Sequence, residues 1–495
     1  MIRHGFDNDL YIQKQSEQIV RRITDFGGKL YLEFGGKLFD DFHAARVLPG
    51  FMPDSKLQML KKLADRVEIV IVINSSDIEK NKIRRDLGIT YDSDVLRLID
   101  EFRGIGLFVG SVVISRYDDK PQALAFKQKL EKLGVKVYLH YSIDGYPYDV
   151  DKIVCEEGLG GNDYIETSRP LVVVTAPGPG SGKMAVCLSQ LFHEHKRGIK
   201  AGYAKFETFP IWNLPLNHSV NLAYEAATAD LKDVNMIDPW HLEAYGKTTV
   251  NYNRDVEIFP VLNAMFKDIW GESPYKSPTD MGVNMAGFCI VDDAAVRKAA
   301  EDEIIRRYYN ALCDVRKDRE TEETAKKIEL LMKKCGITSN SRKVVVAALE
   351  KSEATDDQPA VALELEDGRI ITGKTSKLLG ASSAMLLNAI KTLAGIPDEV
   401  DLISPEIIQP VQRLKTEILG NNNPRLHLDE LLVALTVCAN SDENAKSALA
   451  QIPKLKCCEA HSTVILAQVD EDVFRKLGIN LTCEPVYQTK KFYHG

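Results

Sequence analysis

Hydrophobic and polar positions follow two alternating patterns through the first third of the chain. Short runs rich in β-branched residues, clearest at Val67–Asn74 and Leu171–Thr175, predict strands that are buried on both faces. Amphipathic stretches separate such runs, and residues 121–133 predict a helix between strands at 111–115 and 135–140. Repeated alternation of strand and helix is typical of a mostly parallel sheet with helices on both faces. The sequence therefore predicts an α/β fold.

The pattern changes in the second half of the chain. Charged amphipathic runs over 294–313 and 321–335 predict a small helical subdomain. A polar linker at 353–359 precedes a predicted β-hairpin turning at Asp367-Gly368, then a helix at about 382–393 and strands at 462–466 and 481–483. We therefore expect three parts: α/β domains with a P-loop-like turn over residues 1–290, a helical subdomain over 291–352, and a C-terminal α/β domain over 353–495.

Composition narrows the class of protein. The chain has 495 residues and a formal charge of −8, a balance that argues against general nucleic-acid binding. It has no run of about 20 apolar residues that would span a membrane, and we expect no secretory signal, because residues 1–9 contain no hydrophobic stretch. Its nine cysteines are scattered without a CxxC pair. We expect a cytoplasmic protein that binds neither nucleic acid nor membrane and forms a homo-oligomer.

A glycine-rich turn, Thr175-Ala-Pro-Gly-Pro-Gly-Ser-Gly-Lys183, carries the sharpest chemical signal. It lies between a predicted strand and a predicted helix at 184–195, which is the context of a phosphate-binding loop. Glycines let the backbone approach an anion, and the helix start directs free amides at it. The predicted cofactor-binding residues are Gly178, Gly180, Ser181, Gly182 and Lys183.

Two positions depart from the P-loop pattern. Pro177 stands where that pattern has glycine, and Met184 stands where it has a hydroxyl residue that holds Mg²⁺. Thr175, Ser181 or carboxylates elsewhere are alternative metal ligands. A plain strand-to-helix turn beside an exposed lysine is the alternative interpretation of the whole motif.

The stretch from Tyr203 to Pro260 is dense in polar residues, a pattern typical of a loop that lines an active site. Lys205 follows a predicted strand at 199–204, so in a parallel sheet it would share an edge with Lys183. Carboxylates suit Mg²⁺ or a substrate amine, and an arginine suits a phosphate. The alternative is that these residues cap helices and fix turns. The candidates are the catalytic set Lys205, Asp238, Arg254 and Asp255, with Glu207 behind the two aspartates.

Two weaker candidates lie elsewhere. Gly35 and Gly36, followed by Lys37, form a second strand-end turn that suits an anion or is a plain turn. Cys458 and His461, near Glu459, suit a Cys–His nucleophilic pair or a metal site, although cysteine is more often a small buried hydrophobe.

Five motifs resemble a large bacterial family that is catalogued as a conserved domain of unknown function about 500 residues long. The resemblance covers the whole chain and implies an α/β N-terminal region, a small helical region and a further α/β C-terminal region, with no established reaction to carry over. The motifs are Ile2-Arg-His-Gly-Phe-Asp, Phe34-Gly-Gly-Lys, Ala176-Pro-Gly-Pro-Gly-Ser-Gly-Lys, Asn221-Leu-Ala-Tyr-Glu-Ala-Ala-Thr-Ala-Asp and Glu459-Ala-His-Ser-Thr-Val-Ile-Leu.

Two fainter likenesses concern function. The glycine turn with a lysine at the next strand end is similar to the ATP-dependent synthetase (amidoligase) branch of P-loop proteins, which includes CTP synthetase. The hairpin over 361–372 and its following helix are similar to the cytidine-deaminase fold. That fold's zinc enzymes need H-x-E and P-C-x-x-C, whereas this chain has Ser382-Ser-Ala and no CxxC, so we expect no zinc deamination.

Together these patterns predict an enzyme that uses ATP or another phosphorylated ligand, with Mg²⁺ as the candidate cation. It would act as an ATP-dependent synthetase or ligase, or in phosphoryl transfer on a small metabolite. A non-catalytic sensor or scaffold that binds an anion or metabolite is the alternative, and a hydrolase that uses Cys458 and His461 is a third.

Overall fold

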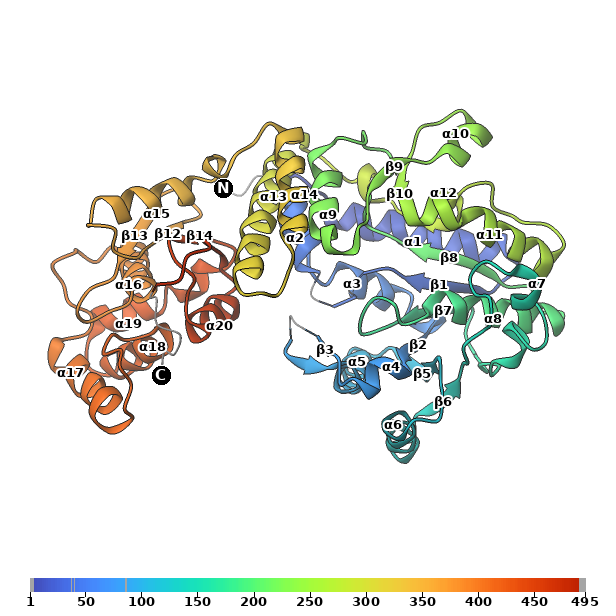
Figure 1. Ribbon diagram of the computed structural model, residues 1–495, viewed down its shortest axis with the longest axis horizontal. Helices are drawn as coiled ribbons and strands as arrows, with labels where there is room; N and C mark the ends of the chain where they lie inside the picture. Colours follow the sequence, from blue (N-terminus) through green and yellow to red (C-terminus); the bar gives the residue numbers. More distant parts are fainter. Residues whose placement is uncertain (1–3, 37, 40, 85–86, 489–495) are drawn as a thin grey trace. The chain divides into compact units, whose positions relative to one another are not determined.

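The computed structural model describes residues 4–36, 38–39, 41–84 and 87–488. The chain divides into two compact units between Ala300 and Glu301, inside the long helix α13 (Asp293–Arg316). Figure 1 shows both units, which we describe separately. The division into three domains that the sequence suggests stays a prediction.

A parallel sheet forms the centre of the N-terminal unit. In the described part of the chain it has seven strands, all parallel, in the order β11-β8-β1-β7-β2-β5-β6. This confirms the predicted α/β fold. The strands are β1 (Leu30–Phe34), β2 (Val67–Asn74), β5 (Phe108–Ser115), β6 (Lys136–Leu139), β7 (Leu171–Thr175), β8 (Gly202–Phe206) and β11 (Gly282–Val283).

The strand order reverses at the middle of this sheet. Strands β1 and β7 are neighbours, with Leu30 beside Leu171, but the chain leaves β1 toward β2 on one side and leaves β7 toward β8 on the other. Such a reversal opens a crevice at the carboxyl ends of the strands, where open α/β sheets bind ligands. The glycine turn directly follows β7 and therefore lies at this reversal.

Helices cover the sheet, as Figure 1 shows for the blue-to-green part of the ribbon. Alternate residues of β7, Val172 and Val174, pack with apolar side chains of helices α8 and α11 in one buried cluster. The helices of this unit are α1 (Asn8–Asp25), α2 (Phe42–Val47), α3 (Ser55–Lys62), α4 (Ser75–Glu79), α5 (Tyr91–Gly104), α6 (Pro121–Lys132), α7 (Val150–Ile153), α8 (Lys183–Lys196), α9 (Ser219–Ala227), α10 (Pro239–Tyr245), α11 (Asn253–Trp270) and α12 (Pro278–Met281). The hairpins β3 (Ile83–Arg84) with β4 (Ile89–Thr90) and β9 (Asn235–Ile237) with β10 (Val250–Tyr252) complete it.

The segment after β8 is more regular than the sequence indicates. The prediction of a long polar loop over 203–260 is wrong, because α9, α10 and the start of α11 lie within it. Pro239 starts α10, a position where its missing amide costs nothing, and Pro260 lies inside α11. The apolar face of α11, with Phe259 and Phe266 buried, stabilises that helix despite the proline.

The strand predicted at 199–204 lies at Gly202–Phe206 instead. Ile199 donates its amide to the Glu194 carbonyl, which extends the end of α8 and delays the strand. Lys205 is therefore a residue of β8 rather than of the loop that follows it. Within the described residues, no helix is long and apolar enough to cross a membrane.

The C-terminal unit is built on a mixed sheet in the order β13-β12-β14-β15. The hairpin of β12 (Ala360–Glu364) and β13 (Ile370–Lys374) matches the prediction, whereas β14 (Glu459–Ser462) ends where the sequence predicts a strand to start. β14 pairs antiparallel with β12 and parallel with β15 (Asn480–Cys483). The other helices are α14 (Glu322–Cys335), α15 (Lys343–Glu353), α16 (Ala381–Ala394), α17 (Pro405–Arg413), α18 (Leu428–Cys438), α19 (Glu443–Leu449) and α20 (Gln468–Leu477).

A buried charge network lies beside β14. Two guanidinium groups, those of Arg306 on α13 and Arg342 before α15, each lie 2.7 Å from the same oxygen of Glu459. Burial acts to raise the pKa of Glu459, but the two arginines outweigh it and hold that pKa below its ordinary value. The second half of α13 therefore belongs to the core of the C-terminal unit.

Candidate functional site

The glycine turn after β7 has a backbone that only glycines accommodate at low cost. Gly180 has φ +73° and Gly182 has φ +89°, both in the left-handed region. A Cβ added at Gly178 would lie 2.3 Å from the Tyr91 hydroxyl oxygen. The glycine pattern in the sequence is therefore explained by turn geometry and by close packing against α5.

Two strand-end side chains hold the carbonyl groups of this turn. The Ser115 hydroxyl at the end of β5 donates to the Ser181 carbonyl at 2.5 Å, and the Asn74 amide at the end of β2 donates to the Gly180 carbonyl at 3.4 Å. In a trans peptide the C=O and N–H groups point in opposite directions. The amides of Ser181 and Gly182 are thereby directed away from Asn74 and Ser115.

These amides have no acceptor in the part of the chain that the structure describes. None of the N–H groups of Gly180, Ser181, Gly182 or Lys183 donates a hydrogen bond there, and Gly182, at the N-cap of α8, provides no side-chain cap. The Ser181 hydroxyl is also buried without a partner among these residues. Gly180 is exposed at the tip of the turn, so the turn is open to solvent. This arrangement is suited to an anion at the start of α8.

Lys183, the first residue of α8, directly follows this turn and is half-buried. Its ammonium makes no hydrogen bond or ion pair with any described residue. Burial lowers the pKa of Lys183; Glu33 on β1 opposes this effect and Lys205 on β8 adds to it. A negative ligand beside the ammonium would remove this electrostatic penalty.

Lys205 lies near the end of β8, which β1 separates from β7 in the same sheet. Lys205 is in register with Glu33 across β8 and β1. Its Nζ pairs with Asp255 on α11 and lies 3.0 Å from Glu207 Oε1. Burial opposes the charge of Lys205, but Asp255 and Glu207 outweigh it and raise the pKa of the ammonium.

Glu207 and Glu33 complete the charge cluster. The pKa of Glu207 is raised to about 7, because burial and Asp255 raise it by more than Lys205 lowers it. Glu33 accepts a hydrogen bond of 2.7 Å from the Tyr203 hydroxyl. We call these five charged groups, Lys183, Lys205, Glu33, Glu207 and Asp255, the strand-end cluster.

The other two predicted catalytic residues make their described hydrogen bonds and ion pairs with residues outside this cluster. Asp238 is fully buried and caps α10, where its oxygens accept from the amides of His241 and Thr279 and from the Thr279 hydroxyl. Arg254 pairs with Asp233 at 2.6 Å. The structure thus joins Lys205 and Asp255 to the cluster and shows helix-capping and ion-pairing contacts for Asp238 and Arg254.

The second glycine pair lies at the end of β1, the strand beside β7. Gly36 has φ +72°, and a Cβ there would lie 3.7 Å from Lys56 Nζ. Lys56 is paired with Asp41 at 2.7 Å. Lys37, which the sequence adds to this turn, lies outside the described residues. Sequence reasoning did not identify Lys56 or Tyr203, because their partners Asp41 and Glu33 lie on other elements that only the fold brings close.

In the C-terminal unit, Cys458 and His461 do not form a nucleophilic pair among the described contacts. Cys458 directly precedes β14, and its thiol lies 3.7 Å from the Lys454 carbonyl. His461 is buried and its ring nitrogens lie 2.9 Å from Thr482 and 3.2 Å from Glu484. Burial raises the pKa of the Cys458 thiol to about 11, which disfavours the thiolate.

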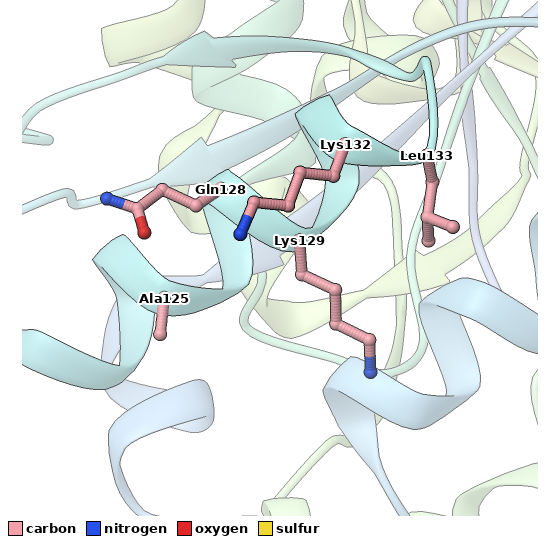
Figure 2. A pocket seen from close by; sticks show the side chains of 5 residues that line it. All are labelled: Ala125, Gln128, Lys129, Lys132 and Leu133. Atoms are coloured by element: carbon pink, nitrogen blue, oxygen red, sulfur yellow. The ribbon is translucent and has the colours of Figure 1, made fainter.

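The described residues contain no group of three or more His, Cys, Asp or Glu placed to hold a metal ion. Figure 2 shows a surface hollow on α6 lined by Ala125, Gln128, Lys129, Lys132 and Leu133. Since α6 runs back from the carboxyl end of β5, its last turns lie toward the opposite edge of the sheet. This hollow is therefore separate from the strand-end cluster.

Comparison with known proteins places the chain in a family. Residues 4–336 match the family described as "Domain of unknown function DUF1846, N-terminal", and residues 340–493 match "Domain of unknown function DUF1846, C-terminal". The chain belongs to the DUF1846 family. It is 58% identical to a UPF0371 protein of Streptococcus pyogenes serotype M5 over 489 residues, 99% of each chain. It is also 58% identical to one of Streptococcus thermophilus strain CNRZ 1066 over 493 residues, 100% of each chain.

The resemblance inferred from the motifs is thereby confirmed over the whole chain. The structural division does not follow the DUF1846 models, however. The N-terminal model extends to residue 336, whereas the compact C-terminal unit begins at Glu301.

We predict that Gly182→Ala destabilises the protein by about 1–2 kcal/mol, because an L residue at this φ is strained. Chemical denaturation measures the change. Gly104→Ala, at a helical position with open space for a Cβ, is the matched control and should leave stability unchanged or slightly higher. Equal losses in both variants would contradict the backbone argument.

We predict a pH-dependent stability difference between the protein and Glu207→Gln. Folding raises the pKa of Glu207 from its ordinary value of 4.5 to about 7, so the folded state binds this proton more tightly. The contribution of Glu207 to stability therefore falls as pH rises from about 4.5 to about 7. Urea unfolding at several pH values should show a smaller fall for Glu207→Gln, while the exposed control Glu243→Gln should follow the parent.

Proposed function

We propose that this DUF1846 protein binds ATP or another phosphorylated ligand at the glycine turn and transfers a phosphoryl group in a reaction on a small metabolite. The observation that carries the proposal is the set of backbone amides over Gly180–Lys183 that have no acceptor among the described residues. Unsatisfied amides at a helix start, next to an unpaired ammonium, match the needs of phosphate oxygens.

Each group of the site has a role in this proposal. The amides of the turn bind phosphate oxygens, and Lys183 neutralises the outer phosphate. Lys205 is oriented by Asp255 and offsets negative charge that develops during transfer. Mg²⁺, which supplies further charge neutralisation when it arrives with ATP, would be held by the phosphates and the Ser181 hydroxyl.

The alternative function is a non-catalytic sensor of an anion or metabolite. The two departures from the P-loop pattern favour it, because Pro177 replaces the first glycine of the loop and Met184 replaces the hydroxyl residue that usually binds Mg²⁺ next to the lysine. Turnover separates the alternatives: an enzyme converts ATP to ADP in the presence of its acceptor, whereas a sensor binds without conversion.

We predict that Lys183→Ala weakens binding of ATP at least about tenfold, because it removes a charge-assisted contact of about 1.5–3 kcal/mol. Isothermal titration calorimetry with ATP and with inorganic tripolyphosphate measures the loss. Lys247→Ala, an exposed lysine after α10, is the control and should bind as the parent does. Absence of binding of either probe to the parent protein would contradict the proposal.

We predict that Ser115→Ala weakens ATP binding several-fold, since the Ser181 carbonyl loses its donor and the turn loses its fixed orientation. Ser111→Ala is a matched control on the same strand, because the Ser111 hydroxyl is buried without a partner in the described residues. Thermal unfolding should confirm that both variants are folded at the temperature of the binding experiment. Equal affinity in the two variants would refute the anchoring role.

A further inference from the structure

Glu207 is placed at the strand-end cluster by two separate features of the fold. It follows directly on β8, two positions after Lys205, so the strand's alternation puts both side chains on one side. Lys205 in turn lies beside Glu33 in the register of β8 with β1, next to the reversal of strand order. Glu207 therefore lies at the same edge as the glycine turn, with the Lys205 ammonium 3.0 Å from its carboxyl.

Groups from four elements face this carboxyl. Lys205 from β8 and Asp255 from α11 are the nearest charges, and the phenols of Tyr252 on β10 and Tyr224 on α9 interact with it electrostatically. Asp255 shares the same ammonium. The Lys205 ammonium is therefore shared between two carboxyl groups, and burial outweighs its effect in raising the pKa of Glu207.

The charge balance of the cluster acts on the pKa of Glu207 as well. With Glu207 ionised, the cluster holds two ammonium groups, Lys183 and Lys205, against three carboxylates. A phosphate at the glycine turn adds further negative charge and so favours the protonated form of Glu207. Burial acts in the same direction, since it raises the pKa of this carboxyl. A base with these properties gains affinity for a proton as the phosphorylated ligand binds.

We propose that Glu207 is the catalytic base of the reaction and that the acceptor of the phosphoryl group is a metabolite hydroxyl. This inference rests on the proposed function. A carboxylate acceptor has no proton for a base to remove. An ammonium-bearing substrate would need an uncommitted carboxylate, whereas Asp255 is paired with Lys205 and Glu33 accepts from Tyr203. An alcohol is the acceptor that uses Glu207 without either conflict.

The step balances without a further reactant. The hydroxyl oxygen of the acceptor attacks the γ-phosphorus of the nucleoside triphosphate and forms the new O–P bond. The bond from that phosphorus to the bridging oxygen breaks, and its electron pair leaves with the nucleoside diphosphate. The proton of the hydroxyl passes to a carboxylate oxygen of Glu207 and is later released to solvent.

The test separates binding from turnover in the full-length protein. Calorimetry with ATP and Mg²⁺ measures binding, and ADP formation is measured with water alone and with panels of metabolite alcohols, amines and carboxylates. We expect Glu207→Gln to bind ATP within about threefold of the parent and to form ADP about 10²–10⁴-fold more slowly. Glu207→Asp should restore part of the rate, and Glu243→Gln is the matched control.

The pH dependence of ADP formation provides a second measurement that a merely structural role would not change. In the parent, the rate should rise with pH to a plateau near neutrality as the base loses its proton, and this rise should be absent in Glu207→Gln. ADP formation that depends on an amine or carboxylate, or an unchanged rate in Glu207→Gln, would overturn the inference. So would ATP binding without any ADP formation, whereas a lack of ATP binding would instead overturn the proposed function.

Discussion

Two hydrogen bonds determine the orientation of the peptide groups in the glycine turn. Ser115 and Asn74 donate to the carbonyls of Ser181 and Gly180. Because each peptide group is planar and trans, the amides of Gly182 and Ser181 then point in the opposite direction. Without those donors, the turn could rotate its peptide groups and satisfy its amides within the protein. The anion site therefore depends on side chains from strands β2 and β5 as much as on the glycines themselves.

The sheet topology brings the remaining charges to this turn. Strands β1 and β8 lie on one side of β7 and strands β2 and β5 lie on the other. One side supplies the ammonium and carboxylate groups at the ends of β1 and β8, while the other supplies the neutral donors that hold the carbonyls. The resulting site has neutral hydrogen-bond donors, Asn74 and Ser115, on one side of β7 and ionisable side chains of β1 and β8 on the other.

Much of this arrangement follows from the sequence, because strands that are buried on both faces appear as nearly continuous runs of β-branched residues. The β-branched run at Val67–Asn74 matches β2 residue for residue, and the turn before Lys183 is recognisable from its glycines alone. Helices between 203 and 260 were missed because polar and proline residues there obscure the helical period, and burial of residues such as Phe259 decides the outcome.

For the site residues too, the sequence predicts some placements and not others. Lys183 and Lys205 are predictable, since their positions relative to strands set the sheet edge on which they lie. The different contacts of Asp238 and Asp255 are not predictable, because each depends on a partner that the fold brings from another element. Local sequence gives an aspartate's position in the chain, but only tertiary structure gives the donors that reach it.

The long helix α13 has a practical consequence for dissecting this family. Its second half contains Arg306, which pairs with Glu459, and Tyr309, whose ring centroid lies 4.8 Å from that of His461. A fragment cut at the border between the two family models, at residue 340, would leave a buried carboxylate with one guanidinium in place of two and expose the imidazole face. Domain limits drawn from sequence families thus divide a single core, and fragments intended to fold independently should start upstream of Glu301.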